Sequence, residues 1–302
     1  PSFNDDIQGT GAVALAGVLS ACSLKKESIA DQTVVIHGAG AGGVGVAWAI
    51  RRGLERAGLS PAEAKKRVLV LDSGGLLVTG RSRMEEYKHD YAQDPADIAG
   101  WTFTGEAPEL LETVRQSKAT VLLGLSGRPK AFDEEIIRAM AANCERPVVF
   151  PLSNPTSSCE AEPVDIFHWS EGRSIVATGS PFEPVAMDGV THPIGQGNNA
   201  FIFPGLGFGA ILSDAKKLTD NMVMAAAESL AKYTIERYVE GGLIYPPIGD
   251  LRATSLIVAE AVIRQAIADG VAMRKDIPED IAGFVQERSW TAEYQPFVRG
   301  AS

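Results

Sequence analysis

Three glycines in G-x-G-x-x-G spacing, Gly38, Gly40 and Gly43, constrain the fold of this chain more than any other feature. They follow the β-branched run 33–36 and precede a segment with helical periodicity, as the motif requires. The first glycine allows a tight turn, the second lets the backbone approach a pyrophosphate, and the third lets the helix pack closely on the strand. The free N–H groups at the start of the helix then face the anion. A glycine-rich turn that binds nothing is the alternative. The residues expected to contact a dinucleotide here are Gly38, Ala39, Gly40, Gly43 and Val44.

An acidic residue is expected at the end of the second strand of a dinucleotide fold, where it binds the adenosine ribose. Asp72 closes the apolar run 68–71 and matches this position. Its separation from the glycines exceeds the usual ~20 residues, and we attribute the excess to an added polar turn over residues 59–67. Asp72 is therefore predicted to bind the cofactor.

Short apolar runs alternate with amphipathic segments from Thr33 to about Thr178, a pattern typical of βαβ units. Right-handed crossovers between such units give a doubly wound parallel sheet. Helices are expected over 10–23, where small and apolar residues alternate, and over 132–140, where acidic residues come first. The expected strands cover residues 34–37, 68–72, 120–124, 147–151 and 174–178.

The strand signal disappears after about Asn199. Residues 214–238 and 254–269 carry helical periodicity and are separated by glycine and proline breakers. We therefore predict an α/β fold in which a Rossmann-type NAD(P)-binding domain, residues 1–199, is followed by a C-terminal helical segment, residues 200–302. This segment has no strands of its own and is not expected to form an independent domain.

The composition argues against several classes of function. A formal net charge of −10 leaves no compensating basic surface for nucleic acid. The most apolar early stretch, 12–21, is too short to cross a bilayer, so no membrane association is expected. The cysteines Cys22, Cys144 and Cys159 are widely spaced, which fits a reducing compartment, by default the cytoplasm, and neither a disulfide framework nor a zinc site.

Two strings are similar to other motifs without meeting their requirements. Ser126 follows the third strand, but Arg128 stands where a G-x-S-x-G nucleophile elbow needs glycine, which argues against a hydrolase. Ser126 is instead expected where a nicotinamide ribose passes the sheet. The glycine-rich string 205–209 lies outside a βαβ frame, so close helix packing explains it better than a ligand.

Four more strings accompany the glycine turn along the chain. They are FNDDIQGT at 3–10, LSNPT at 152–156, ATGSPF at 177–182 and GQGNN at 195–199. Together with LLVTGR at 76–81 and LIYPP at 243–247, this ordered set resembles the malic enzyme family over essentially the whole chain. The resemblance implies oxidative decarboxylation of malate to pyruvate by a homo-oligomer, with NAD or NADP as cofactor and Mg²⁺ or Mn²⁺ as metal.

Asp5 and Asp6 offer the hard oxygen ligands that Mg²⁺ and Mn²⁺ prefer. From the residues alone, a helix N-cap is the simpler interpretation of an acidic pair before an apolar helix. The resemblance implies that Asp6 binds the metal, with Asp5 beside it in the site. It also implies that the other carboxylate ligands of the family lie upstream of Pro1.

Two asparagines are candidates for substrate contacts. Asn154 follows an apolar run and is expected at the carboxyl end of a strand, where ligands bind in open α/β sheets. An Asx-turn at Asn154 and a loop tip at Asn198 are the structural alternatives. The resemblance implies that both contact the substrate carboxylate or the nicotinamide region, as uncharged amides can without competing for the metal.

The sequence gives conflicting indications of whether the cofactor is NAD or NADP. Asp72 suits a ribose diol and would repel a 2′-phosphate, which favours NAD. Ser73 and Lys88 resemble the arrangement of NADP-using members of the family, in which a lysine in this region meets the phosphate. We therefore expect NADP slightly in preference to NAD.

The resemblance implies a lysine as general base and a tyrosine as general acid, both in an N-terminal domain that this sequence does not include. No catalytic residue is therefore assigned, and the chain is expected to be the C-terminal NAD(P)-binding domain of a malic enzyme, incomplete as a catalyst. Two alternatives stay open. One is a malolactic-type enzyme that converts malate to lactate with bound NAD, and the other is a non-catalytic dinucleotide-binding module.

Overall fold

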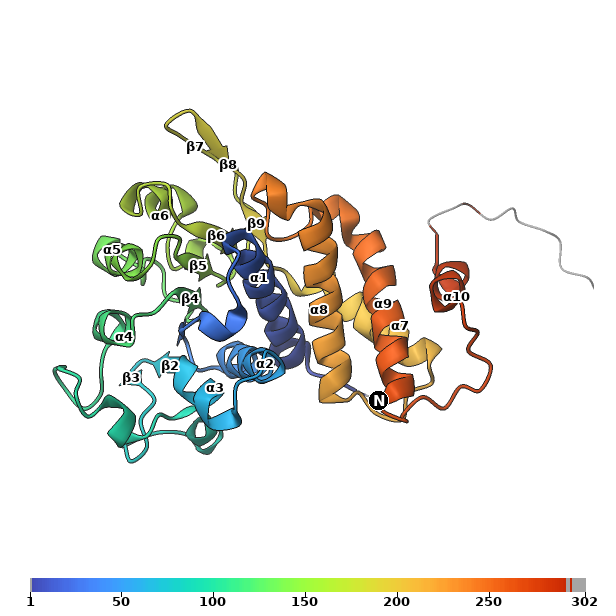
Figure 1. Cartoon of the computed structure of the whole chain (residues 1–302), viewed down its shortest axis with the longest axis horizontal. Helices are drawn as coiled ribbons and strands as arrows, with labels where there is room; N and C mark the ends of the chain where they lie inside the picture. Colours follow the sequence, from blue (N-terminus) through green and yellow to red (C-terminus); the bar gives the residue numbers. More distant parts are fainter. Residues whose placement is uncertain (1, 292–293, 295–302) are drawn as a thin grey trace, which may run out of the picture.

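The computed structural model describes residues 2–291 and 294, and its centre is a seven-stranded sheet in the order β3-β2-β1-β4-β5-β6-β9 (Figure 1). All neighbouring strands are parallel except β2 and β3. The order reverses between β1 and β4, where doubly wound folds bind their ligands. The predicted α/β fold is confirmed. Its five long strands, all at the predicted places, are β1 (Val34–His37), β2 (Val68–Asp72), β4 (Val121–Gly124), β5 (Val148–Pro151) and β6 (Ile175–Thr178).

The sheet is buried on both faces, as a parallel sheet requires. Side chains alternate along a strand, so Val34 and Ile36 of β1 enter one core and Val35 enters the other. The first face is covered by α1 (Thr10–Lys25), α2 (Ala41–Arg56) and α3 (Pro61–Arg67). The opposite face is covered by α4 (Leu110–Ser117), α5 (Glu134–Asn143) and α6 (Pro163–Trp169).

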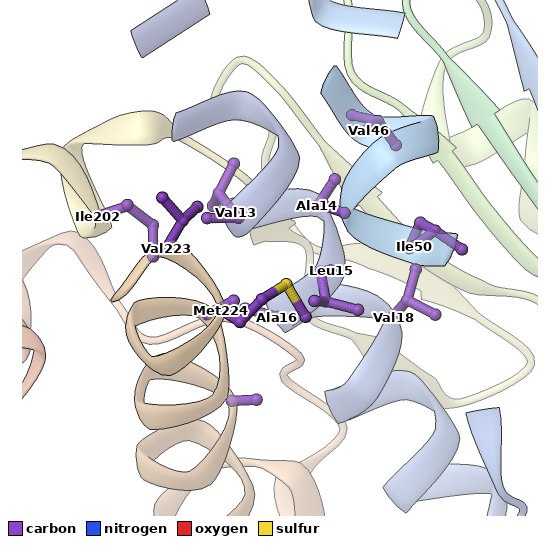
Figure 2. Packing of buried hydrophobic residues seen from close by; sticks show 14 of the residues in the cluster. Val13, Ala14, Leu15, Ala16, Val18, Val46, Ile50, Ile202, Val223 and Met224 are labelled. Atoms are coloured by element: carbon purple, nitrogen blue, oxygen red, sulfur yellow. The ribbon is translucent and has the colours of Figure 1, made fainter. Parts of the chain in front are cut away.

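Helix α1 packs between α2 and α8 (Asp220–Arg237), and most of its side chains are buried (Figure 2). Val18 lies beside Ile50 of α2, whereas Val13 faces Val223 of α8. The apolar residues of α1 therefore point in all directions, because a helix enclosed by other elements needs no polar face.

The helix that contains α1 is longer than the apolar stretch 12–21. A π-helix, Asp5–Gly9, runs into α1, so the helical segment covers 5–25 and is long and apolar enough to cross a membrane. The expectation that the apolar segment is too short was wrong, because it left out the turns at both ends. In the folded chain, 67% of its most apolar window is buried inside the protein, which is the environment of a core helix.

The C-terminal helices are α7 (Phe203–Leu212), α8, α9 (Leu251–Ala268) and α10 (Ile281–Arg288). Helices α8 and α9 lie where the periodicity predicts them. The glycine-rich string 205–209 is part of α7, where a Cβ on Gly209 would lie 2.7 Å from the carbonyl oxygen of Ala259 in α9. The close helix packing predicted for this string is confirmed.

Several elements escape prediction from the sequence. The polar turn expected over 59–67 was wrong, because Ser60 and Glu63 form a capping box that begins helix α3. Strands of two or three residues are too short to show a period, and they are β3 (Gly75–Leu76), β7 (Val185–Met187), β8 (Val190–His192) and β9 (Gly195–Gln196). Of these, β7 and β8 form a hairpin that projects beyond the sheet (Figure 1). The short 3₁₀ turns are Ile29–Asp31, Glu86–Tyr91, Pro95–Ile98, Thr156–Ser158, Asn199–Phe201, Val239–Gly241 and Ile248–Asp250.

The C-terminal helices share a hydrophobic core with the sheet. Phe201, Leu206 and Val223 belong to the same buried cluster as Val34 and Ile36. Helix α1 connects the two parts, since it packs on both α2 and α8. The helical segment is therefore continuous with the core of the sheet, and the division at residue 199 stays a prediction.

Candidate functional site

The glycine turn connects β1 to the start of α2. Gly38 has φ +120°, and a Cβ there would lie 2.3 Å from the carbonyl oxygen of Leu125. A Cβ on Gly43 would lie 1.7 Å from the carbonyl oxygen of Gly38, so the helix can approach the strand only with glycine at this position. At Gly40 no atom lies within 4 Å of the Cβ position. The turn is thus closed at its first and third glycines and open at its second, where a phosphate would approach.

The other two residues predicted in this turn contribute less to a cleft. Ala39 is buried, and its carbonyl oxygen accepts a hydrogen bond from the hydroxyl of Tyr87 at 3.2 Å. Val44 is buried, and its N–H donates to the carbonyl oxygen of Gly40 at 3.0 Å. Val44 therefore presents no free polar group. The N–H groups that α2 leaves unpaired in its first turn belong to residues 41–43.

Two adjoining cavities lie at the carboxyl edge of β1, β2 and β4. One has a volume of about 390 Å³ and extends toward Gly75, Glu106 and Glu109. The other has a volume of about 270 Å³ and lies over the glycine turn. Both are lined by His37, Asp72, Ser73 and Arg128. Together they form an elongated cleft at the reversal of strand order, with Asp72 at the junction of its two parts.

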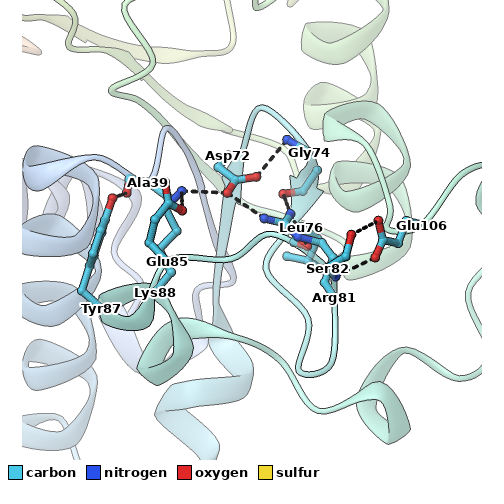
Figure 3. A network of polar contacts seen from close by, with 11 residues as sticks. Ala39, Asp72, Gly74, Leu76, Arg81, Ser82, Glu85, Tyr87, Lys88 and Glu106 are labelled. Atoms are coloured by element: carbon cyan, nitrogen blue, oxygen red, sulfur yellow. Dashed lines mark hydrogen bonds and ion pairs between the residues drawn. The ribbon is translucent and has the colours of Figure 1, made fainter.

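Asp72 is the centre of a charged network (Figure 3). Its Oδ2 accepts from Arg81 Nη2 at 2.6 Å and from Lys88 Nζ at 2.8 Å, and its Oδ1 accepts from the N–H of Gly74 at 2.9 Å. Burial alone would raise the pKa of Asp72, but the hydrogen bonds from Arg81 and Lys88 outweigh it and hold this pKa below its usual value. The carboxylate is therefore charged and held by two cations.

Lys88 is not free to meet a phosphate. Its side chain is 8% exposed, and its Nζ lies 2.6 Å from a carboxylate oxygen of Glu85 as well as 2.8 Å from Asp72. These two carboxylates raise the pKa of Lys88 although burial opposes the charged form. Two acids and two bases, counting Arg81, leave the network neutral. Ser73, by contrast, is exposed at the edge of the cleft.

His37 forms part of the floor of both cavities and is only 8% exposed. Its Nδ1 is buried without a hydrogen-bond partner in the described part of the chain. Burial lowers the pKa of His37, the charge of Arg128 lowers it further, and that of Glu160 raises it. His37 is therefore uncharged at neutral pH.

Ser126 is bound to a residue that the sequence analysis missed. Its hydroxyl donates to Glu160 Oε1 at 2.8 Å, and its N–H donates to the same oxygen at 2.9 Å. Glu160 is fully buried. Nothing in the local sequence distinguishes it from the neighbouring Glu162, which is exposed.

The two candidate asparagines lie at one edge of the sheet. Asn154 is exposed after β5, and its Oδ1 accepts from the hydroxyl of Ser180 at 2.6 Å. Asn198 follows β9, and its Oδ1 accepts from the N–H of Ala200 at 2.9 Å. Gln196 connects the two segments by donating to the carbonyl oxygen of Gly179 at 3.2 Å. In both asparagines the oxygen has a protein partner, which leaves the NH₂ groups as the donors for a ligand.

Tyr245, which the sequence analysis included in the LIYPP string without giving it a role, supports the GQGNN segment. Its ring is fully buried, and its hydroxyl donates to the carbonyl oxygen of Val13 at 2.8 Å. A Cβ on Gly195 or Gly197 would lie 3.2 Å or 3.0 Å from atoms of Tyr245. These two glycines therefore make room for the tyrosine, and the tyrosine fixes the segment that carries Asn198.

The acidic pair near the N-terminus lies beside the same segment. Asn199 Nδ2 donates to Asp5 Oδ2 at 3.1 Å and to the carbonyl oxygen of Asp5 at 3.2 Å. Asp5 Oδ1 is buried without a partner in the described residues, whereas Asp6 is exposed. Within residues 2–291 and 294, no group of three acidic, histidine or cysteine side chains could hold an ion. The unpaired oxygen of Asp5 and the free carboxylate of Asp6 fit part of a Mg²⁺ or Mn²⁺ ligand set, which would need further ligands.

Comparison with known proteins gives a consistent match. The family described as "Malic enzyme, NAD binding domain" matches residues 7–267. An NAD-dependent malic enzyme from Shewanella pealeana is 42% identical over 299 residues, which are 99% of this chain and 53% of that protein. NAD-dependent malic enzyme 3 from Bacillus subtilis is 43% identical over 297 residues, 98% of this chain and 52% of that protein. This chain thus spans about half the length of these curated relatives.

Solved structures show the same similarity. A crystal structure of Entamoeba histolytica malic enzyme superposes with a TM-score of 0.75 at 29% identity, over 95% of this chain and 53% of that one. A malic enzyme from Pyrococcus horikoshii Ot3 gives a TM-score of 0.70, also at 29% identity, over 95% of this chain and 59% of that one.

Proposed function

This chain belongs to the malic enzyme family, and from this premise we propose that it is the dinucleotide-binding part of an enzyme that oxidatively decarboxylates malate to pyruvate while reducing NAD⁺. The observation that carries the proposal is the open space over Gly40, at the start of α2 and beside the reversal of strand order. A dinucleotide centred there would extend one way toward Asp72 and the other way toward Asn154.

We propose NAD rather than NADP as the cofactor, which reverses the expectation from Lys88. A 2′-phosphate near Asp72 would meet a neutral ion-pair network and a cavity that also carries Glu106 and Glu109. Carboxylates repel a phosphate, and both cations of the network, Arg81 and Lys88, are already paired with carboxylates. The matched relatives from Shewanella and Bacillus are named NAD-dependent.

The mechanism assigns roles to residues of this chain according to their positions. Gly40 and the first turn of α2 would bind the pyrophosphate, and Asp72 would accept from the adenosine ribose. The NH₂ groups of Asn154 and Asn198 would donate to a substrate carboxylate and orient it. Asp6, with Asp5 beside it, would hold Mg²⁺ or Mn²⁺, which when bound polarises a substrate oxygen as a Lewis acid. We assign no proton-transfer residue within the described part of the chain.

The test is calorimetric titration of the 302-residue chain with NAD⁺ and with NADP⁺. We expect NAD⁺ to bind more tightly. Gly40→Val should abolish binding and keep the fold, because a branched side chain would fill the space of the pyrophosphate. Gly58→Val is not a suitable control, because Gly58 has φ +106°. Gly100→Val, with open space at its Cβ position and no positive φ, should bind like the unchanged protein. Equal affinity for NAD⁺ in the Gly40 variant would overturn the proposal.

A further inference from the structure

Glu160 occupies the space above the end of β4. Its carboxyl carbon lies 2.5 Å from the position that a Cβ on Gly124 would take, and Gly124 is the last residue of that strand. The side chain reaches this place from the segment after β5 and is 0% exposed. A glycine at the end of β4 is therefore needed so that a carboxyl group can lie between two strand ends.

The carboxyl group is bound only by neutral donors. Oε1 accepts from the N–H of Ser126 at 2.9 Å, from its hydroxyl at 2.8 Å and from the hydroxyl of Ser153 at 2.5 Å. Oε2 has a single long contact, 3.4 Å, with the N–H of Ser153. No lysine, arginine or histidine of the described residues lies within ion-pair distance of Glu160. Burial of an acid without a cation is costly, so these hydrogen bonds are what hold it in place.

The contacts of Glu160 join loops that follow successive strands. Ser126 lies in the loop after β4, and its hydroxyl also accepts from the N–H of Arg128 at 3.2 Å. Ser153 lies after β5 and directly precedes Asn154, and its hydroxyl accepts from the N–H of Gly127 at 2.9 Å. Asn154, the next residue along the chain, accepts separately from the hydroxyl of Ser180 in the loop after β6. One carboxyl group thus anchors the loops after β4 and β5, and the second of these loops carries Asn154.

We propose that Glu160 is a positioning residue for the nicotinamide half of the cofactor, which it does not itself touch. In a doubly wound sheet the adenosine half lies on the side of β2, so the nicotinamide half must lie over the ends of β4 to β6. Glu160 fixes two of these loops, those after β4 and β5. Loops held in the bound geometry before binding lose less conformational freedom when the ligand arrives, which raises affinity. This inference rests on the proposed dinucleotide function.

The chemistry of the three donors predicts how substitutions should differ. Glu160→Gln keeps a carbonyl oxygen for all three donors to Oε1, and its amide group replaces Oε2, which has only one long contact. Glu160→Asp keeps the carboxyl group but shortens the side chain by one methylene, so it cannot reach both serines. Glu160→Ala removes every contact. The glutamine variant should therefore behave most like the unchanged protein.

The experiment compares binding of NAD⁺ and of ADP-ribose, which lacks the nicotinamide, to the 302-residue chain. The alanine and aspartate variants lose buried hydrogen bonds to Glu160, so their affinity for NAD⁺ should fall by about tenfold or more. Their affinity for ADP-ribose should stay within about twofold of that of the unchanged chain. The glutamine variant should stay within about threefold for both ligands. Glu162→Gln, an exposed glutamate two residues away, is the matched control and should change neither affinity.

Several outcomes would overturn the inference. Equal losses for NAD⁺ and ADP-ribose would mean that Glu160 only stabilises the fold. Unchanged NAD⁺ affinity in the alanine and aspartate variants, or tighter binding of ADP-ribose than of NAD⁺ by the unchanged chain, would show that these loops do not serve the nicotinamide. If the alanine variant does not fold, as thermal unfolding will show, the aspartate and glutamine variants provide the comparison. Failure of the unchanged chain to bind either ligand would instead overturn the proposed function.

Discussion

Residues of the same type behave differently in the cleft, because burial and partners decide what each charge can do. Arg81 is 4% exposed and bound to Asp72, whereas Arg128 is exposed and forms no ion pair among the described residues. Lys88 lies between two carboxylates. Among the described residues that line both cavities, Arg128 is therefore the cation without an ion pair.

Lys88→Met should test whether this lysine selects the cofactor. The substitution removes one of the two cations on Asp72, which disturbs the ribose site for either dinucleotide. We expect the affinities for NAD⁺ and NADP⁺ to fall by similar factors, about fivefold to thirtyfold each, as for loss of a hydrogen bond to a charged group. Calorimetric titration of both cofactors measures this, with Lys232→Met, an exposed lysine on α8, as control. A loss of affinity confined to NADP⁺ would contradict this prediction and show that Lys88 binds the 2′-phosphate.

The buried His37 should make stability depend on pH. Its pKa is lowered in the folded chain, so below its usual value of 6.5 the unfolded chain binds more protons than the folded one. The free energy of unfolding should therefore rise with pH between the lowered pKa of His37 and 6.5. The contribution of His37 to stability is fully present above 6.5 and decreases as the pH falls below it. Urea unfolding at several pH values measures this. The free energy of unfolding should depend less on pH in the His37→Asn variant, whereas the variant of the exposed His168, His168→Asn, should keep the pH dependence of the unchanged protein. An unchanged slope in the His37 variant would contradict this assignment.

The sequence predicts only some residues of the site, and the reason is distance along the chain. The glycine turn and Asp72 belong to local patterns, a strand followed by a turn and a helix, so they can be read without tertiary structure. Asn199 contacts Asp5 across 194 positions, and Ser126 contacts Glu160 across 34. No local pattern encodes such pairs. The ion pair of Lys88 with Asp72, 16 positions away, is missed for the same reason, since it depends on a 3₁₀ turn folding back onto β2.

At the scale of elements, the long strands are predictable because each is a short continuous apolar run, and α8 and α9 because their apolar residues recur with helical spacing. Shorter elements depend on their neighbours: β9 has two residues and exists because it pairs with the end of β6. Helix α7 is a further case, since glycines are poor helix formers, and Gly205 and Gly209 lie where a side chain would collide with α9.

The contact between α7 and α9 provides a matched pair of substitutions. Gly209→Ala places a Cβ 2.7 Å from a backbone oxygen of α9, so the helices must separate, and we expect a loss of about 1–3 kcal/mol in the free energy of unfolding. Gly207→Ala, on the other side of the same helix, meets its nearest atom only at 4.0 Å and should be neutral or stabilising by up to about 1 kcal/mol. Urea unfolding of both variants measures the difference. Equal effects would mean that the helices do not depend on this close approach.

For the molecule as a whole, the described residues place the proposed metal ligands Asp5 and Asp6 next to the start of α2, at the proposed dinucleotide cleft. Asp5 and Asp6 provide two carboxylates, and no third ligand group lies near them in residues 2–291 and 294. The curated relatives are about twice as long as this chain. Metal binding and proton transfer are therefore expected to require groups outside the described residues.

We predict that the 302-residue chain binds NAD⁺ but oxidises malate at less than about a hundredth of the rate of an intact relative, because we assign no general base among the described residues and the lack of one costs about that much. Joining it to the other half of a relative such as the Bacillus subtilis enzyme should restore NADH and pyruvate formation. Asp6→Asn should then abolish turnover and leave NAD⁺ binding intact, whereas Asp188→Asn, in the exposed turn between β7 and β8, should change neither.

Two results would contradict this prediction. Rapid malate oxidation by the 302-residue chain alone would show that it contains the catalytic groups. Formation of lactate without NADH in the joined protein would instead identify malolactic chemistry.

The position of α1 also has a consequence for synthesis on the ribosome. This helix emerges well before its partners in α8, which follow some two hundred positions later, and the hydroxyl that binds Val13 belongs to Tyr245, 232 positions away. Until then one apolar side of α1 has nothing to cover it, and exposed apolar helices in nascent chains are targets for aggregation and for chaperones. The order in which these segments are made therefore opposes the order in which their core is completed, and folding of this core should be limited by the arrival of α8 and Tyr245.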